Sequence, residues 1–489
     1  MTLSLQPAQT ESNAPDSHVA YTAARVAHWD AVAASLDRWH GWGGLYHRRL
    51  GQAYRFLVPP GARVLELGCG AGDLLAACRP SLGVGLDFSP EMIRRAARRH
   101  PKCRFLLADA QDVPLRGTYD FVILSDLVND VWDVQKVLEG VRRLMHPRSR
   151  LILNVYSRLW EQPLALAEKL GLAKPTLYQN WLTVDDLDSL LRLAGLEKIR
   201  HWSEVAWPLS TPVLEPFGNR FLVRIPPFSL LGMSNFVLAR PAGPATARAE
   251  QPSVSIVVPV RNEAGNLAPL LDRLPSFEGE EDVIFVEGHS QDDSRAVLEQ
   301  EVSRRRDRRL KILGQSGVGK GDAVRAGFAE ATGDILMILD ADLSVRPEDL
   351  PRFRDALVSG AAEFVNGVRL VYPMEDRAMR FLNLVGNKIF GMLFSWLLGQ
   401  PVKDTLCGTK ALWRSDYERI AAQRAYFGDF DPFGDFDLLF GAARLGLKIL
   451  DLPIRYQRRT YGKTNIQRWK HGWLLFRMVL FAAGRVKFI

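Results

Sequence analysis

The chain has 489 residues, of which 47% are apolar and 24% charged; the length predicts two or three domains, and the composition excludes a globally disordered chain. Its 63 basic and 55 acidic residues give a net charge of +8, which fits anionic ligands or an anionic membrane surface as well as simple solubility. The four cysteines form no C-x-x-C pair, which argues against a disulfide framework or a cysteine zinc site and fits a reducing cytosol.

Residues 1–20 are polar and contain no apolar core, so they are predicted to form a flexible tail and not a signal peptide. The stretch 241–252 is small, polar and punctuated by proline. Because strand signals restart after it, we place a linker there, between a first domain at 21–240 and a second at 253–489.

Apolar runs alternate with helix-like stretches in the first domain. The runs that predict strands are Arg63–Leu67, Gly83–Leu86, Phe121–Leu124 and Leu151–Asn154. Strands that alternate with helices form a mostly parallel sheet with helices on both faces. The pattern therefore predicts a doubly wound α/β fold.

A glycine-rich turn follows the first of these strands. Residues 64–74 read as strand, turn and helix start, with glycines where the backbone must turn sharply and approach a ligand closely. Asp87 ends the next strand, where a carboxylate can accept both ribose hydroxyls of a nucleoside. This arrangement predicts a nucleoside cofactor.

The charge beside the turn distinguishes two kinds of cofactor. A dinucleotide places its pyrophosphate at the helix N-terminus after the glycines, but Asp73 stands there and would repel it. Glu66 adds a second carboxylate. Both residues suit a cationic sulfonium with an amino-acid tail.

The motif from Glu66 to Gly72 resembles E-x-G-x-G-x-G of class I S-adenosylmethionine-dependent methyltransferases, and the likeness extends over about residues 40 to 200. It implies a Rossmann-like fold and S-adenosylmethionine as cofactor. The cofactor-binding residues that it implies are Glu66, Gly68, Gly70, Gly72, Asp87, Phe88, Asp109 and Ala110. Ordinary turn or cap chemistry remains the alternative for Asp109. No residue pattern identifies the methyl acceptor.

Strand signals in the second domain lie at Ser253–Pro259, Asp282–Val286, Lys311–Leu313 and Ile335–Leu339, which predicts a second parallel α/β sheet. The last of them leads into Asp340-Ala341-Asp342. Carboxylates at i and i+2 are predicted to point to one side and to hold a hard divalent ion, Mg²⁺ or Mn²⁺, with the diphosphate of a ligand. An acidic loop without function is the alternative.

The order of segments resembles family 2 GT-A glycosyltransferases over about residues 253 to 465, most closely the dolichyl-phosphate mannose synthase and polyprenyl-phosphate sugar transferase branch. The likeness rests on the first strand with its polar loop, the Gly-Lys-Gly-Asp-Ala segment, the D-x-D motif and the motifs at 364–369, 404–410 and 434–437. Glu287-Gly288 replaces the paired aspartates of many relatives. Lys410 replaces an arginine, which keeps the charge but loses the bidentate fork.

This resemblance implies a nucleotide-diphospho-sugar donor bound by Pro259, Asn262, Glu263, Glu287, Lys320, Asp340, Ala341 and Arg369. It implies a metal ion at Asp340 and Asp342, and an acceptor held by Asp404, Lys410 and Arg459. The catalytic residues that we predict are Asp342, Asp435, Asp437 and Lys410. A phosphate acceptor needs no strong base, whereas a hydroxyl acceptor would give its proton to Asp435 or Asp437.

Two apolar stretches near the C-terminus, 381–398 and 469–483, have the composition of helices that lie in a membrane surface. A packed helix pair or a dimer face is the alternative. Neither contains 18 uninterrupted apolar residues, so no segment is expected to span a bilayer. The loop 461–465 resembles the mobile loop that closes over the donor in this family.

Together these features predict a bifunctional, cytoplasmic enzyme, peripheral on the inner face of the cell membrane. It would transfer a sugar to a polyprenyl phosphate, glycolipid or glycan, and a methyl group to an unidentified acceptor, with no nucleic-acid partner. The alternative is a glycosyltransferase joined to a non-catalytic methyltransferase-like module for binding or assembly.

Overall fold

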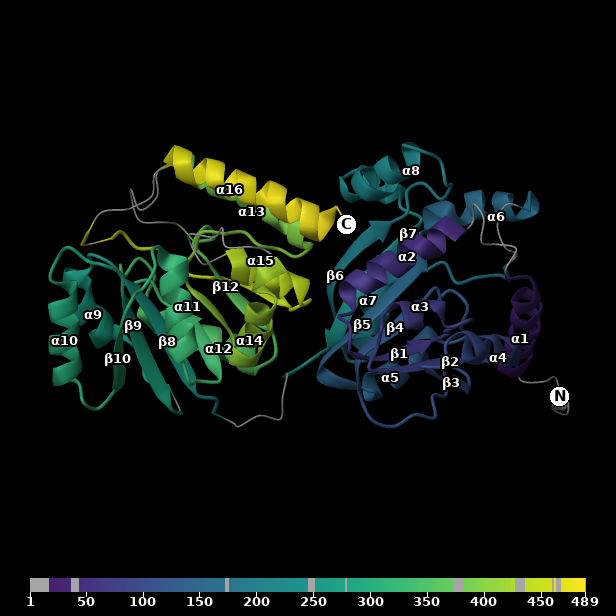
Figure 1. The fold of residues 1–489 in the computed structure, drawn as a ribbon, viewed down its shortest axis with the longest axis horizontal. Helices are drawn as coiled ribbons and strands as arrows, with labels where there is room; N and C mark the ends of the chain where they lie inside the picture. The colour runs from purple at the N-terminus through teal and green to yellow at the C-terminus, as the bar shows by residue number, and fades with distance from the viewer. Residues whose placement is uncertain are drawn as a thin grey trace, which may run out of the picture. The chain divides into compact units, whose positions relative to one another are not determined.

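Two seven-stranded sheets, one in each half of the chain, organise the computed structural model (Figure 1). The residues that the structure describes are 17–36, 44–171, 176–244, 251–277, 279–372, 381–426, 436–459, 461–462 and 468–488. The chain divides into two compact units, which comprise Met1–Leu196 with Ser203–Phe236, and Glu197–Trp202 with Val237–Ile489.

The first sheet has the strand order β3-β2-β1-β4-β5-β7-β6. Its strands are β1 (Arg63–Leu67), β2 (Leu82–Asp87), β3 (Arg104–Leu107), β4 (Tyr119–Ser125), β5 (Met145–Tyr156), β6 (Leu196–Glu204) and β7 (Ser234–Pro241). Strands β1 to β5 pair in parallel, so all four predicted strands are confirmed. The sequence prediction did not include β3, β6 and β7.

The helices of this half are α1 (Ser17–Ser35), α2 (Gly44–Leu57), α3 (Asp73–Ala77), α4 (Pro90–Arg99), α5 (Val134–Arg143), η2 (Arg158–Trp160), α6 (Glu161–Lys169), α7 (Val184–Leu193), α8 (Leu214–Pro216), η3 (Phe217–Phe221), η4 (Leu222–Arg224) and η5 (Phe228–Leu231). Their starts follow local chemistry: Ser89 caps α4 ahead of Pro90, and Thr183 forms a capping box with Asp186 at α7. Helix α1 begins at Ser17, so it includes the last four residues of the predicted tail 1–20, and residues 1–16 lie outside the described part.

Strand β7 runs against its neighbours. The amide of Ser157, just after β5, donates to Met233 O (2.7 Å), and the amide of Met233 donates to Val205 O, just after β6 (2.8 Å). The start of β7 therefore lies beside the ends of β5 and β6, which makes β7 antiparallel to both. The segment 205–232 thus begins and ends at the carboxyl edge of the sheet, where ligands of such folds bind.

The second sheet has the order β10-β9-β8-β11-β13-β12-β14. Its strands are β8 (Val254–Val260), β9 (Glu281–Glu287), β10 (Arg309–Gly314), β11 (Ile335–Ile338), β12 (Phe364–Val368), β13 (Lys410–Trp413) and β14 (Ile449–Pro453). The four predicted strands are confirmed, but the prediction of a parallel sheet was wrong in one respect. Strand β13 is antiparallel to β11 and β12, so the sheet is mixed.

Both faces of this sheet are buried. Val257 and Ile338 pack into the core on one face, and Val258 and Met337 into the core on the other, so successive residues alternate between two apolar layers. The covering helices are α9 (Ala264–Arg273), α10 (Ser294–Arg304), α11 (Lys320–Glu330), η6 (Pro347–Asp349), α12 (Leu350–Val358), α13 (Phe381–Leu398), α14 (Arg414–Ala422), η7 (Arg424–Tyr426), α15 (Phe436–Arg444), α16 (Arg468–Ala482) and η8 (Ala483–Lys487).

Helices α13 and α16 pack side by side (Figure 1). Phe394 of α13 and Leu475 of α16 belong to the same core, which is the helix pair that we considered as an alternative to a membrane surface. Their outer face still exposes apolar side chains, including Trp473 and Leu480. Within the described residues, no helix has the length and apolar character needed to cross a bilayer. A peripheral membrane role for this pair stays a prediction.

The predicted linker 241–252 falls between the last residue of β7, Pro241, and the first of β8, Val254. The domain boundaries themselves stay a prediction.

Candidate active sites

The glycine turn after β1 has the backbone that its sequence requires. Gly68, Gly70 and Gly72 have φ of 70°, 49° and 74°, a region that side chains disfavour. A Cβ at Gly68 would meet Leu127, and one at Gly72 would meet Phe105, whereas nothing lies within 4 Å of a Cβ at Gly70. Two of the glycines thus serve packing, and Gly70 faces the open space that a cofactor needs.

Asp87 at the end of β2 lies against this turn. Its carboxylate accepts the amides of Gly70 and Ser89, each at 2.9 Å. Burial raises the pKa of Asp87, although these two amides act to lower it. Each oxygen keeps a lone pair for a further donor, such as a ribose hydroxyl.

Glu66 is buried on β1 with only 2% of its surface exposed. Its Oε2 atom has no hydrogen-bond partner among the described residues. Burial raises the pKa of Glu66 well above its usual value; the amide of Leu75 acts against this, and Asp87 and Asp73 add to it. An orphaned carboxyl oxygen below an open glycine turn fits a cationic cofactor, since a positive group would satisfy it and restore its ionised form.

Asp73 is the first residue of helix α3, the position that the sequence analysis gave it, but its carboxylate already has partners within the protein. It pairs with His100 Nε2 at 2.7 Å and with Arg99 at 3.2 Å, both at the end of α4. These basic partners already balance the charge of Asp73, so Glu66 is the carboxyl group at the turn that a cationic cofactor would satisfy.

Asp109, Ala110 and Phe88 follow β3 and β2. Asp109 accepts the amide of Gln111 at 2.9 Å, as in an Asx turn, and His18 of α1 approaches it at 3.9 Å. Ala110 is buried and Phe88 half-buried. The turn chemistry held open for Asp109 is thus present, and its contact with adenine stays a prediction.

Helix α1 contacts residues at the ends of several strands, which the sequence analysis missed. Asp30 accepts from Ser89 Oγ (2.5 Å), and Arg25 pairs with Asp130 (2.7 Å) in the loop after β4. These pairs join residues about 59 and 105 positions apart, so no local signal could reveal them.

A second missed group surrounds Asp126, directly after β4. This residue has φ of 56° and accepts from Tyr46 Oη (2.8 Å) and from Asn154 Nδ2 (2.6 Å). Its neighbour Leu127 is the side chain that a Cβ on Gly68 would meet. The group therefore lies beside the glycine turn that follows β1.

In the second half, the D-x-D motif follows β11. Lys320 Nζ, at the start of α11, lies 2.5 Å from Asp340, and Arg459 lies 2.5 Å from Asp342. Asp342 also accepts from Ser344 Oγ at 2.6 Å. Burial acts to raise the pKa of Asp340, but attraction to Lys320 and to Arg369 and Lys410 outweighs it and holds that pKa below its usual value.

The segment after β14, at residues 454–459, lies against the D-x-D motif and the residues that follow it. Tyr456 pairs with Val345 in an antiparallel bridge, and the amide of Gln457 donates to Ser344 O at 2.9 Å. This register places Arg459 against Asp342. Tyr461 and Gly462 lie near the loop of Asn262: a Cβ on Gly462 would be 3.4 Å from Asn262 O. Residues 463–465 of the predicted mobile loop lie outside the described part.

Glu263, next to β8, completes the charged group. It is 3.6 Å from Arg459 and accepts from Asn266 Nδ2 at 2.6 Å. Burial raises the pKa of Glu263 to about 7; Arg459 and Asn266 act against this, and Asp342 and Asp340 add to it. Three carboxyl groups and two cationic groups thus share one small region.

Replacing Glu263 with glutamine is expected to stabilise the chain at pH 8. The unfolded carboxyl releases its proton near pH 4.5 and the folded one near pH 7, so the folded state binds more protons between these values and stability falls as the pH rises. Glu263→Gln should gain up to about 3 kcal/mol at pH 8 and nothing at pH 4. Denaturant unfolding at both pH values measures this; a pH-independent difference would contradict it.

Gly408 is a further residue of the site. A Cβ there would collide with Lys320 Nζ and with the carboxylate of Asp340. The backbone of the 404–410 motif therefore forms one wall of the cradle around Asp340, and a side chain at 408 would have to displace Lys320 or Asp340.

Behind this wall, Arg369 and Asp404 form a bidentate pair at 2.7 and 2.9 Å. The Asp404 and Lys410 side chains are fully buried, and Lys410 Nζ donates to Cys407 O. Arg369 stacks its guanidinium on Tyr456, 5.0 Å from the ring centre. The predicted contacts of Asp404 and Lys410 with an acceptor stay predictions.

The remaining donor-binding predictions lie at the same edge of the sheet. Asn262 has φ of 58° and accepts the amide of Gln291 (2.7 Å); Glu287 ends β9 and accepts the amide of Ser290 (2.6 Å). Pro259 is half-buried in β8 and Ala341 is buried between the two aspartates. Their contacts with a donor stay predictions.

Of the two predicted bases, Asp435 and Asp437, the structure describes Asp437. Asp437 is the second residue of α15, where it accepts the amide of Leu438 (2.8 Å) and lies 3.9 Å from Arg424. Asp435 lies outside the described residues. Their catalytic role stays a prediction.

The donor atoms at the D-x-D motif fit a divalent ion. Asp340 and Asp342 supply hard carboxylate oxygens, and each is already matched to positive charge by a basic side chain. Across the ranges that the structure describes, no group of three or more His, Cys, Asp or Glu side chains forms a protein cage for a metal. An ion here would take its remaining ligands from the donor diphosphate and water.

Comparisons with known proteins match the two halves separately. Residues 59–195 match the family model of a methyltransferase domain, and residues 255–420 match that of glycosyl transferase family 2. Glycosyltransferase AglJ of Haloferax volcanii is 29% identical over 226 residues, which cover 46% of this chain and 70% of AglJ. The undecaprenyl-phosphate 4-deoxy-4-formamido-L-arabinose transferase of Edwardsiella ictaluri is 26% identical; the match covers 43% of this chain and 62% of that relative.

Solved structures similar to the chain include an S-adenosylmethionine-dependent methyltransferase of Thermotoga maritima, with 19% identity and a TM-score of 0.35 over 44% of this chain and 98% of that one. They also include glucosyl-3-phosphoglycerate synthase of Mycobacterium tuberculosis, with 20% identity and a TM-score of 0.36 over 49% of this chain and 81% of that one. The chain therefore carries a methyltransferase domain at residues 59–195 followed by a family 2 glycosyltransferase domain at residues 255–420, each built on a seven-stranded α/β sheet.

Proposed function

We propose that the second domain transfers a sugar from a nucleotide-sugar to a polyprenyl phosphate, and that the first transfers a methyl group from S-adenosylmethionine to a separate acceptor. The observation that carries the first part is the pairing of Asp340 with Lys320 and of Asp342 with Arg459 at a carboxyl sheet edge. The relatives named for undecaprenyl-phosphate sugar transfer support the acceptor class. We place the enzyme in the cytoplasm, on the inner face of the membrane.

The paired charges explain how this site would receive a diphosphate. A divalent ion held by Asp340 and Asp342 would neutralise charge on the departing diphosphate. Lys320 and Arg459 would then exchange their carboxylate partners for phosphate oxygens, which keeps every charge matched as the donor enters. Arg369 and Lys410 strengthen the positive field at Asp340. A phosphate acceptor is mostly ionised near neutral pH, so no base is required of the chain.

Donor turnover tests the sugar transfer. UDP- and GDP-sugars are screened with Mn²⁺ in the presence and absence of undecaprenyl phosphate. The expected result is product on the lipid phosphate from one donor class. Transfer to a soluble hydroxyl acceptor with none to the lipid phosphate would contradict the proposed acceptor.

The first domain is proposed to bind S-adenosylmethionine through Glu66, Gly70 and Asp87. Glu66 would receive the amino group, the open space at Gly70 would admit the nucleoside, and Asp87 would accept the ribose hydroxyls. Asp126, with Tyr46 and Asn154, would orient the acceptor. The competing function is a non-catalytic module for binding or assembly.

Replacing Asp87 with asparagine is expected to weaken S-adenosylmethionine binding by about 10- to 100-fold, because hydrogen bonds to a charged acceptor are lost. Calorimetric titration of the full chain measures this, with Asp112→Asn at an exposed position as control. Equal affinity of both variants would contradict the role of Asp87. Transfer of labelled methyl then separates catalyst from binding module.

A further inference from the structure

The segment 205–232 exposes an unusual number of large apolar side chains. It connects β6 to β7 through α8, η3, η4 and η5, which pack one against the next. Phe217 is 55% exposed and Leu230 67%. Four more large apolar side chains of the segment are exposed: Leu214, Phe221, Phe228 and Leu231. Single exposed apolar residues are ordinary, but a cluster of this kind marks a binding surface.

This exposure belongs to a built structure. Asn219 is fully buried, and its side-chain amide exchanges two hydrogen bonds of 2.8 Å with the backbone of Trp207. The same amide donates to Glu215 at 3.1 Å. These hydrogen bonds hold the backbone of the segment in one conformation. The exposure of its apolar side chains is therefore part of the folded structure.

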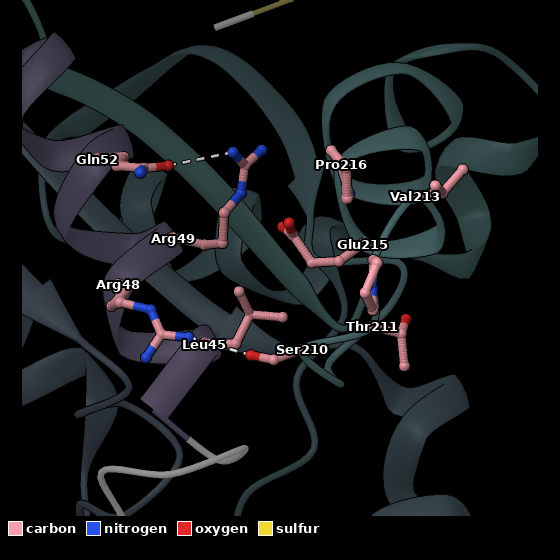
Figure 2. A pocket seen from close by; sticks show the side chains of 10 residues that line it. Leu45, Arg48, Arg49, Gln52, Ser210, Thr211, Val213, Glu215 and Pro216 are labelled. Carbon is pink, nitrogen blue, oxygen red and sulfur yellow. Dashed lines mark hydrogen bonds between the residues drawn. The ribbon is translucent and has the colours of Figure 1, made fainter.

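A cavity of about 430 Å³ opens between this segment and α2. Figure 2 shows Arg48 and Arg49 on one side of it and Ser210, Thr211 and Glu215 on the other. Arg48 donates to Ser210 Oγ at 3.1 Å, and Arg49 donates to Gln52 Oε1 at 3.1 Å. The lining thus combines two guanidinium groups with hydroxyl and amide groups, the chemistry that recognises a phosphate ester.

The cavity carries excess positive charge. Within the described part of the chain, neither Arg48 nor Arg49 forms an ion pair with a carboxylate, and the Nε of Arg49 has no hydrogen-bond acceptor. Burial lowers the pKa of Arg49; the charges of Glu204 and Glu215 act against this, and those of Arg224 and Arg220 add to it. The two arginines lie beside exposed apolar side chains. An anionic lipid likewise carries a charged phosphate next to its hydrocarbon chains, so it would match both kinds of group.

The surface lies at the cofactor edge of the domain. The segment begins and ends where β6 and β7 meet the end of β5. Helix α2, which carries Arg48 and Arg49, also carries Tyr46, the partner of Asp126 beside the glycine turn. A lipid held here would therefore bring its headgroup to the side of the sheet that faces the cofactor.

We propose that the exposed apolar side chains of 205–232, with Arg48 and Arg49, form a docking surface for an anionic membrane, with a lipid phosphate seated in the cavity. The apolar side chains enter the interfacial region while the guanidinium groups bind the headgroup. The surface belongs to the methyltransferase domain and is independent of either transferase activity.

Vesicle binding of the full chain tests this. Phosphatidylcholine vesicles with and without phosphatidylglycerol are floated with the unmodified chain and four variants, one of which is Trp473→Ser/Phe476→Ser on α16. The first, Arg48→Gln/Arg49→Gln, should bind the anionic vesicles about 10- to 30-fold more weakly and lose most of its salt dependence. The second, Phe217→Ser/Phe228→Ser, should lose about tenfold or more. The matched control Arg98→Gln/Leu193→Ser alters an exposed charge and an exposed apolar residue elsewhere in the same domain, and should keep its affinity.

Five outcomes would overturn the proposal. The first is no flotation of the unmodified chain, and the second is equal binding by all variants. The third is a loss confined to Trp473→Ser/Phe476→Ser on α16, which would assign membrane contact to the other domain alone. The fourth is a concentration-dependent dimer that Phe217→Ser/Phe228→Ser abolishes, which would assign the surface to a second copy of the chain. Competition by soluble glycerol 3-phosphate without vesicle binding would instead show a site for free phosphate esters, and would also overturn it.

Discussion

Replacing Asp342 with asparagine is expected to lower kcat/KM for the nucleotide-sugar donor by about 10³-fold or more. The amide retains the volume and can still contact Ser344, so the loop should keep its shape. It removes the negative charge that pairs with Arg459 at 2.5 Å and that would hold the metal ion. Donor hydrolysis with Mn²⁺ measures the effect.

The control variant removes an exposed carboxylate of the same domain. Asp355→Asn removes a carboxylate whose side chain is 68% exposed, so it should leave turnover unchanged. Raising the Mn²⁺ concentration should recover part of the activity of Asp342→Asn, because Asp340 still provides one carboxylate. Full donor turnover in Asp342→Asn without added metal would remove the role assigned to both aspartates.

The strands could be predicted because their sequences are nearly uninterrupted apolar runs. Strand β1 and strand β8 are buried on both faces, and a buried parallel strand has no polar alternation to obscure it. Glycines with positive φ and carboxylates at strand ends are also local signals, so both candidate sites could be placed in the sequence. Local signals therefore predict which strand ends contain the candidate site residues.

Partners distant in sequence could not be predicted in this way. Lys320 and Asp340 are 20 residues apart and Arg459 and Asp342 are 117 apart, and only the folded loops bring them together. The same reason hides the antiparallel β13, whose orientation depends on the path between β12 and the 404–410 motif. Asp73 shows the same limit, since its position at the start of α3 was a local signal but its pairing with His100, 27 residues away, was not.

The departure at Glu287-Gly288 also has a structural reason. A Cβ on Gly288 would lie 2.6 Å from Oε1 of Gln315, so an aspartate at this position would require the Gln315 side chain to move. Gln315 in turn donates to Gly319 O at 2.7 Å, just before Lys320. Glycine at 288 therefore leaves space for the Gln315 side chain, which in turn contacts the start of the helix that carries Lys320.

Replacing Asp404 with alanine is expected to destabilise the second domain by about 3–5 kcal/mol, because it leaves Arg369 buried without a counter-charge. Asp404 is fully buried and also accepts from Asn387 Nδ2 (2.9 Å) and the amide of Leu406 (3.1 Å). Denaturant unfolding followed by tryptophan fluorescence measures the loss. An exposed aspartate that only met an acceptor would cost little stability when removed.

The double variant Arg369→Met/Asp404→Ala separates the two roles of this pair. Removing both charges should restore part of the stability, since no ion then remains buried and unpaired. Donor turnover should stay low, because the positive field of Arg369 at Asp340 is lost with it. A double variant as unstable as Asp404→Ala would show that the other hydrogen bonds of Asp404, and not the ion pair, hold the wall of the donor site. Recovery of stability together with full turnover would show that Arg369 acts in folding alone.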